Sequence, residues 1–188
     1  DVELAGFPHH SLDTYLPKLV RAGQRVAICD QLEDPKMTKK IVKRGVTELV
    51  TPGVSFNDQV LDLKKNNFLC SINFNKQILG VSFLDISTGE FLITEGSYEY
   101  VEKLIQSFEP KEIIYNKSDS KLFDSIFANK YYSFRLEDWV FKIDYALELL
   151  NKQFGTNSLK GFGVHELKEG IVSAGSIIHY ISENQHDR

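Results

Sequence analysis

The spacing of apolar residues changes several times along the chain, and each change marks a new predicted element. From residue 11 to 22 apolar side chains recur three or four positions apart, which is typical of an amphipathic helix, and Gly23 supplies its stop. Pro17 fits this helix only if the helix begins near Asp13 or Thr14, so that the proline lies in its first turn. Alternating runs at 25–31 and 46–51 then predict two strands.

A second unit opens after residues 55–66, which read as a linker. Three alternating runs separated by short turns predict an antiparallel meander, and helices and strands then alternate. The predicted elements are strands 67–74, 78–86 and 90–94, helix 97–108, strand 111–115, helix 120–128, strand 131–135 and helix 143–154. This β-β-β-α-β-α-β-α order predicts an α/β fold of the ribonuclease-H-like type with a mixed sheet, preceded by a partial α+β domain. A further amphipathic helix is expected between Glu166 and Ser182.

Composition excludes a few classes and locates one charged segment. The chain has 188 residues, a net charge of −4 and no apolar run near the ~20 residues that span a bilayer. Because its net charge is negative, the chain as a whole is not a basic nucleic-acid binder. Five basic residues and no acidic one lie between Pro35 and Thr47: Lys36, Lys39, Lys40, Lys43 and Arg44. This segment is either a phosphate-contacting edge or a solvated charged loop. Cys29 and Cys70 both sit in apolar runs and are expected to be buried free thiols.

Three short motifs in the first 54 residues carry a family resemblance. They are Ala5-Gly6-Phe7-Pro8-His9-His10, then the segment from Val26 to Pro35 (VAICDQLEDP), then Val50-Thr51-Pro52-Gly53. Further on, FLDISTGEF at 83–91, QFGT at 153–156 and GFG at 161–163 extend the similarity. In this order they resemble the MutS family of bacterial DNA mismatch-repair proteins.

The resemblance implies a division of the chain. Residues 1–54 would be the C-terminal part of the mismatch-recognition domain, 55–66 a linker, 67–157 the connector domain and 158–188 the start of the lever and core region. The first residue is not Met, and the chain is expected to be a fragment. The Phe-x-Glu motif of the family would lie upstream of Asp1, and no Gly-x-x-x-x-Gly-Lys-Ser/Thr motif occurs. This piece is therefore expected to hold no cofactor and to be no enzyme.

The same resemblance implies the setting in which the piece works. The full-length parent is expected to be a cytoplasmic homodimeric ATPase that uses ATP and Mg, binds double-stranded mismatched DNA and recruits MutL. The basic segment would then approach the DNA backbone. The connector would relay state between domains and dock MutL through the polar side of the helix 144–153, namely Glu148, Asn151, Lys152 and Gln153. No catalytic residue and no metal ligand is assigned.

Other interpretations remain open. Asp85, at the end of a predicted strand, could bind a metal in a ribonuclease-H-like nuclease or phosphotransferase, but it could equally cap its own turn. Glu112 opens the next strand without an obvious companion. Trp139 and Phe141 could anchor a partner or pin the following helix to the sheet, and His9 and His10 are expected to form a packing turn. A pure interaction module that makes no contact with nucleic acid is a third hypothesis.

Overall fold

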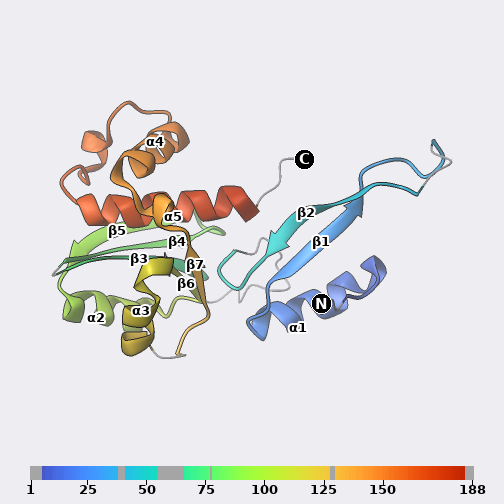
Figure 1. Cartoon of the computed structure of the whole chain (residues 1–188), viewed down its shortest axis with the longest axis horizontal. Helices are drawn as coiled ribbons and strands as arrows, with labels where there is room; N and C mark the ends of the chain where they lie inside the picture. The colour runs from blue at the N-terminus through green and yellow to red at the C-terminus, as the bar shows by residue number, and fades with distance from the viewer. Residues whose placement is uncertain (1–5, 38–40, 55–65, 77, 128–129, 185–188) are drawn as a thin grey trace.

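Two unequal parts lie side by side in the computed structural model of the chain, which describes residues 6–37, 41–54, 66–76, 78–127 and 130–184 (Figure 1). The described residues up to 54 form an elongated part, here called the arm. Those from 66 onward form a larger layered part, here called the connector. In Figure 1 the hairpin of the arm points away from the connector, so the outer end of the arm is the point farthest from the large sheet.

The arm is one helix packed on a two-stranded sheet. A short 3-10 turn, η1 (His9–Ser11), leads into α1 (Leu12–Arg21), and β1 (Val26–Gln31) pairs antiparallel with β2 (Arg44–Val50). The helix begins at Leu12, so the expectation that Pro17 falls in the first turn is wrong. Pro17 is buried inside α1, and since it has no N–H, the helix gives up one backbone hydrogen bond there. Among the described residues, the buried core of the arm consists of Leu16, Val20 and Val50.

The connector is built on a mixed five-stranded sheet. Its strands are β3 (Phe68–Asn75), β4 (Ile78–Asp85), β5 (Glu90–Gly96), β6 (Glu112–Asn116) and β7 (Ser133–Leu136), in the spatial order β5-β4-β3-β6-β7. The first three strands form an antiparallel meander, while β6 runs parallel to β3 and β7 runs parallel to β6. The predicted fold class, an α/β unit with a mixed sheet and this order of elements, is confirmed.

Helices cover both faces of this sheet, as Figure 1 shows. The bounds are α2 (Tyr98–Phe108), α3 (Ser120–Phe127), α4 (Ile143–Phe154) and α5 (Lys168–Asn184), with short 3-10 turns η2 (Lys117–Asp119), η3 (Asp138–Phe141) and η4 (Leu159–Phe162). Alternate residues of β3 serve the two faces: Cys70 and Ile72 belong to the core under α2 and α3, and Leu69 belongs to the core under α5. Burial on both faces agrees with the sequence of the first half of β3, where four of the five residues Phe68–Ile72 are apolar.

The last helix, α5, packs unusually close to the sheet. A Cβ on Gly80 would lie 1.9 Å from the backbone oxygen of Glu169, so only glycine permits this approach. Two pairs of buried hydroxyls fill the interface, Ser71 with Ser176 at 2.6 Å and Ser82 with Ser173 at 2.7 Å. Because α5 covers the connector sheet, we describe it with the connector, and the expected domain boundaries stay a prediction. None of the helices in the described ranges is both long and apolar enough to cross a membrane.

Candidate functional site

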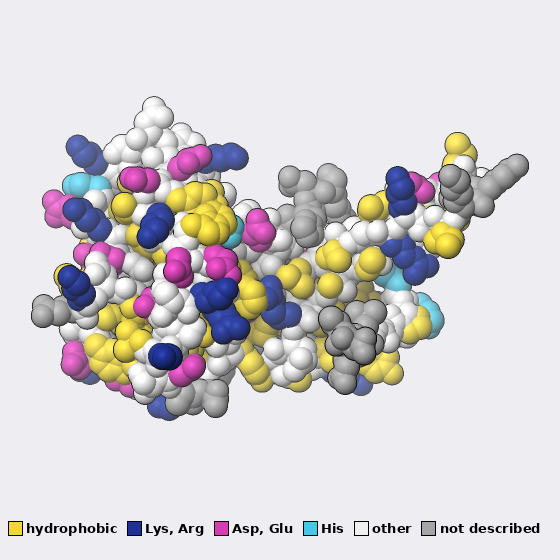
Figure 2. Space-filling view, in the orientation of Figure 1, with side chains coloured by type: hydrophobic (Ala, Val, Ile, Leu, Met, Phe, Trp, Pro, Cys, Tyr) yellow, Lys and Arg dark blue, Asp and Glu magenta, His cyan; other side chains and the backbone are white. Residues whose placement is uncertain are grey.

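Three of the five basic residues expected to approach DNA lie at the outer end of the arm. Lys36, Lys43 and Arg44 are located there, and Figure 2 shows Lys and Arg side chains gathered on this part of the molecule. Lys39 and Lys40 fall outside the described residues. The ammonium of Lys43 lies 3.6 Å from a carboxylate oxygen of Glu33, but both side chains are solvent-accessible, so the pair leaves Lys43 available to another anion.

Local contacts shape the hairpin that presents these residues. Arg44, the first residue of β2, pairs with Gln31, the last residue of β1, and the amide of Leu32 continues the pairing by donating to the carbonyl of Lys43. Between the strands, the Thr47 hydroxyl donates to Asp30 Oδ2 at 2.9 Å. His9 Nε2 lies 3.3 Å from Asp30 Oδ1 and ties η1 to the sheet. His9 and His10 are both exposed, so this turn contributes a polar contact and no buried packing.

One expectation about the arm is wrong. Cys29 is exposed, whereas Cys70 is buried; both are free thiols. The alternation in β1 places Val26 and Ile28 on the side of α1 and Cys29 on the opposite side of the sheet. Among the described residues, no second layer covers that opposite side. Burial raises the pKa of the Cys70 thiol well above its ordinary value, so the two thiols differ in reactivity.

The junction between arm and connector centres on the carboxylate of Glu112, the first residue of β6. Its Oε2 accepts hydrogen bonds from the Thr51 hydroxyl at 2.6 Å and the Gly53 amide at 3.0 Å, both from the arm. Its Oε1 accepts one from the Tyr180 hydroxyl of α5 at 2.7 Å. Glu112 is only 2% exposed, and burial together with this carboxylate raises the pKa of Tyr180 far above its ordinary value.

Further contacts surround this carboxylate. The Arg25 guanidinium lies 3.8 Å from the centre of the Phe134 ring and 5.7 Å from that of Tyr180, a cation–π arrangement across the junction. A Cβ on Gly23 would lie 1.9 Å from the ring of Tyr132, so the end of α1 sits directly on the connector. The partners of Glu112 are distant in sequence, which is why the sequence alone indicates no companion for it. The only signal in the sequence is general: a charged residue in a strand predicted to be buried needs a hydrogen-bonding or charged partner.

Asp85 serves a structural role. Its Oδ1 accepts hydrogen bonds from the amide and hydroxyl of Ser87 at 2.9 and 2.6 Å, and its Oδ2 accepts one from the Asn67 amide at 3.0 Å. Burial acts to raise the pKa of Asp85, but these hydrogen bonds outweigh it and hold the pKa below its usual value. With both oxygens engaged by protein donors, Asp85 caps the turn between β4 and β5, which agrees with the second of its two interpretations.

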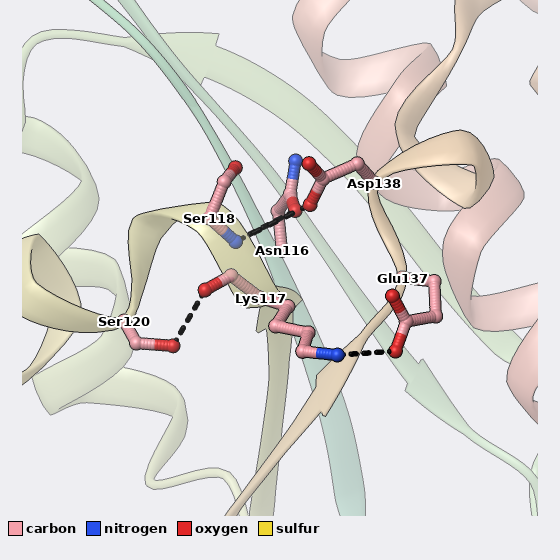
Figure 3. A network of polar contacts seen from close by, with 6 residues as sticks. All are labelled: Asn116, Lys117, Ser118, Ser120, Glu137 and Asp138. Carbon is pink, nitrogen blue, oxygen red and sulfur yellow. Dashed lines mark hydrogen bonds and ion pairs between the residues drawn. The ribbon is translucent and has the colours of Figure 1, made fainter.

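The two carboxylates that follow β7 bind residues of the loop that follows β6 (Figure 3). Lys117 Nζ lies 2.8 Å from Glu137 Oε1, and the Ser118 amide donates to Asp138 Oδ1 at 3.3 Å. Burial and the neighbouring Asp138 raise the pKa of Asp119. Within the part of the chain that the structure describes, no three His, Cys, Asp or Glu side chains are arranged to hold a metal ion.

The residues expected to face MutL lie on α4, and the structure separates them into two groups. Lys152 and Gln153 are exposed and Glu148 is accessible, whereas Asn151 is half-buried and its side-chain oxygen has no hydrogen-bond partner among the described atoms. Nearby, the Trp139 ring is 53% exposed and makes T-shaped contacts with Tyr145 of α4 and His179 of α5, each at 5.1 Å. Phe141 is buried. These contacts favour the interpretation that the aromatic pair pins α4 to the rest of the connector.

Fold and junction together define a class: a mixed α/β connector domain carrying part of a smaller domain. The chain belongs to the MutS family, because the family model "MutS domain II" matches residues 67–188 and "MutS domain I" matches residues 1–59. It is similar along its whole length to proteins named DNA mismatch repair protein MutS, with 64% identity over 188 residues to that of Flavobacterium johnsoniae and 63% to that of Flavobacterium psychrophilum. The relative from Bacteroides thetaiotaomicron is 60% identical over 185 residues. The chain spans about 22% of the length of each of these relatives.

Proposed function

We propose that this chain works as the DNA-facing arm and connector of a mismatch-repair protein that recognises mismatched DNA and couples recognition to ATP hydrolysis. The observation that carries the proposal is the basic group at the outer end of the arm, in a chain of the MutS family. Positive charge on a projecting element adds affinity for phosphates that is independent of base sequence. In this proposal ATP and Mg serve other parts of the complete, cytoplasmic, homodimeric protein.

The DNA role is testable through salt dependence. In a chimera, this chain would replace the matching 188 residues of the Flavobacterium johnsoniae relative. The basic set Lys36, Lys39, Lys40, Lys43 and Arg44 would be changed to Gln. Since each neutralised phosphate contributes about 0.9 to the slope of log affinity against log salt, the slope should become shallower by about that amount for every phosphate that the variant no longer neutralises.

A matched control removes the same amount of charge from the connector. Five lysines of that part serve this purpose: Lys103, Lys121, Lys130, Lys142 and Lys160. Their replacement by Gln changes the net charge equally, so any long-range effect of charge appears in both variants. An arm variant with the same affinity and the same slope as this control would contradict the phosphate role and favour an interaction module without nucleic-acid contact.

We also propose that α4 docks MutL and that the connector relays state between domains. The support is the accessibility of Glu148, Lys152 and Gln153 on one side of a helix that is firmly packed on its other side. Titration of the chimera with MutL should show binding that the triple change Glu148→Ala, Lys152→Ala, Gln153→Ala weakens. Equal binding by this variant and by a control altered in the exposed side chains Lys121 and Asp124 of α3 would remove α4 from the docking surface.

The alternative of a metal-dependent nuclease or phosphotransferase centred on Asp85 finds no support in the geometry. Both oxygens of Asp85 are occupied by donors of the chain itself. A general metal-assisted mechanism needs several carboxylates that converge on one ion with free oxygen lone pairs. The capping role of Asp85 accounts for its position without an ion.

A further inference from the structure

The Glu112 carboxylate joins three elements that come from both parts of the molecule. It stands at the start of β6, one oxygen faces the arm, and the other faces α5. We propose that Glu112 is a positioning residue that fixes the direction in which the arm leaves the connector. The importance of that direction for DNA rests on the proposed function, but the positioning itself is a property of this chain alone.

The turn that meets Glu112 is shaped to hold a carboxylate. Thr51 and Val54 exchange backbone hydrogen bonds of 3.1 and 3.2 Å, and the Val54 amide also donates to the Thr51 hydroxyl oxygen at 3.1 Å. This tight closure leaves the hydroxyl proton of Thr51 and the amide of Gly53 directed at one oxygen of Glu112. Such a pair of converging donors resembles the backbone concavities that bind anions elsewhere in proteins.

Space at the turn is as restrictive as its hydrogen bonds. A Cβ on Gly53 would lie 2.9 Å from the Cβ of Glu112 and 2.9 Å from a methyl carbon of Leu69. Both neighbours are buried in the connector, so neither can move aside cheaply. Glycine at this position therefore lets the backbone of the arm approach the sheet closely enough to reach the carboxylate.

The chemistry of the donors makes the arrangement selective. The three described partners of Glu112 are two hydroxyls and one amide, all of them uncharged. A buried carboxylate held by neutral donors is satisfied only when every donor is in place, because each missing one leaves charge poorly solvated. The arm and α5 must then occupy their positions together. If the arm left the connector in another direction, Thr51 and Gly53 would move away from Glu112, and its buried carboxylate would lose two hydrogen bonds.

Other contacts around Glu112 also hold the arm against the connector. The carbonyl of Pro52 accepts a hydrogen bond from the Asn67 side chain at 3.2 Å, and Val54 belongs to the core beneath α5. Arg25 reaches the ring of Tyr180, whose hydroxyl donates to Glu112. Tyr180 thus contacts the arm through its ring and the carboxylate through its oxygen. Glu112, itself a residue of the sheet, is bonded to the turn and to α5 at the same time.

A distance measurement tests the proposal without DNA. The exposed Cys29 in β1 takes a spin label, whereas the buried Cys70 stays unreactive, and Lys121→Cys on α3 provides a second labelled site in the connector. Pulsed electron–electron double resonance on the 188-residue chain then reports the distribution of distances between arm and connector. The parent chain should give one narrow distribution.

Glu112→Ala should broaden this distribution at least about twofold, because the turn is left without its acceptor. Glu112→Gln should keep it narrow, since the amide oxygen still accepts from Thr51 and Gly53 while the amide nitrogen donates to the Tyr180 oxygen. The control Ile113→Val alters the neighbouring residue of β6, whose side chain belongs to the core on the other face of the sheet, and should leave the distribution unchanged.

A narrow distribution at the parental distance in Glu112→Ala would overturn the proposal. Should that variant lose its circular-dichroism signature of folding, Thr51→Val serves instead. It removes a single donor to Glu112, broadening is expected, and an unchanged distribution overturns the proposal equally. Because no DNA is present, this outcome is independent of the salt-slope experiment: loss of the phosphate role would leave the positioning role standing, and the reverse also holds.

Discussion

The sheets of the arm and of the connector differ in how many of their faces are covered by helices. The connector sheet is covered on both faces, and its central strand β3 is buried at six consecutive residues, Phe68–Asn73. The arm sheet has α1 on one face only among the described residues, and its described core holds three buried side chains. A part with so small a core depends on its attachment for order, since few buried contacts oppose local opening. Within the described ranges, the connector therefore holds most of the buried core, while the arm leaves one face of its sheet accessible to a partner.

The strongest test of this difference compares one core deletion in each part. Phe83 is 1% exposed, and the centre of its ring lies 4.7 Å from that of Phe108, so Phe83→Ala should lower the free energy of unfolding by about 3–5 kcal/mol. Leu16→Ala in the arm should lower it by about 2 kcal/mol. Chemical denaturation followed by circular dichroism measures both changes.

Hydrogen exchange then shows where each deletion acts. Leu16→Ala should accelerate exchange in β1 and β2 while the amides of β3 and β4 keep their protection. Phe83→Ala should reduce protection throughout the connector. Equal acceleration across both parts in Leu16→Ala would erase the distinction and show one cooperative unit.

A smaller effect should follow from acidification of the connector. The folded pKa of Asp85 is lower than its usual value, so its stabilising contribution is present above about pH 4 and is lost as the pH falls through the folded pKa. Asp85→Asn should lower stability at neutral pH by about 1 kcal/mol and flatten the loss of stability in acid.

Denaturant titrations from neutral pH down to about pH 3 measure this flattening. Asp124→Asn is the matched control, since Asp124 is an exposed carboxylate on α3 and should leave the pH dependence close to that of the parent. A variant Asp85→Asn with the full parental acid sensitivity would show that other carboxylates govern acid unfolding.

The smallest expected effect is a fluorescence change confined to the connector. Trp139 is the only tryptophan in the sequence, and its ring lies 5.1 Å from that of His179. Burial lowers the pKa of His179, against the opposing influence of Glu183, and the ring accepts from or donates to the Tyr145 hydroxyl at 2.9 Å. The stabilising contribution of neutral His179 is therefore fully present above about pH 6.5 and lost as the pH falls through its folded pKa.

Titration of the emission below about pH 6.5 should show quenching of Trp139 as His179 takes up a proton, and His179→Gln should abolish this step. His165→Gln, which alters an exposed histidine, should retain it. Persistence of the step in His179→Gln would assign the transition to another group.

Sequence pattern predicts the two parts unequally well, for physical reasons. In the connector, long apolar runs and short turns specify each strand and helix locally, and every predicted element is present with boundaries shifted by a few residues. The junction cannot be predicted in this way. Thr51 and Tyr180 lie 61 and 68 residues from Glu112 in sequence, so their meeting depends on the complete packing of α5 and the arm.

Single-residue expectations fail where exposure depends on a neighbouring layer. The alternation around Cys29 marks a strand but not which of its faces another layer covers, so the pattern predicts a buried thiol where the structure has an exposed one. The sequence groups Asn151 with the polar side of its helix, yet its side-chain oxygen is buried, and the neighbouring Leu150 belongs to the core that α4 shares with η4 and α5. Pattern gives the period of an element; the surrounding elements decide which positions meet solvent.

The placement of Glu112 on β6 has a mechanical consequence. The strand lies between β3 and β7 and is bound to both by parallel ladders, so a load on the outer end of the arm reaches an interior strand of the sheet instead of an edge strand. The arm itself is held there by two hydrogen bonds to one carboxylate and a few side-chain contacts. We expect this attachment to yield under tension before the ladders do, because fewer hydrogen bonds hold the arm than hold β6 in the sheet. The connector would then keep its fold while the arm detaches from the carboxylate.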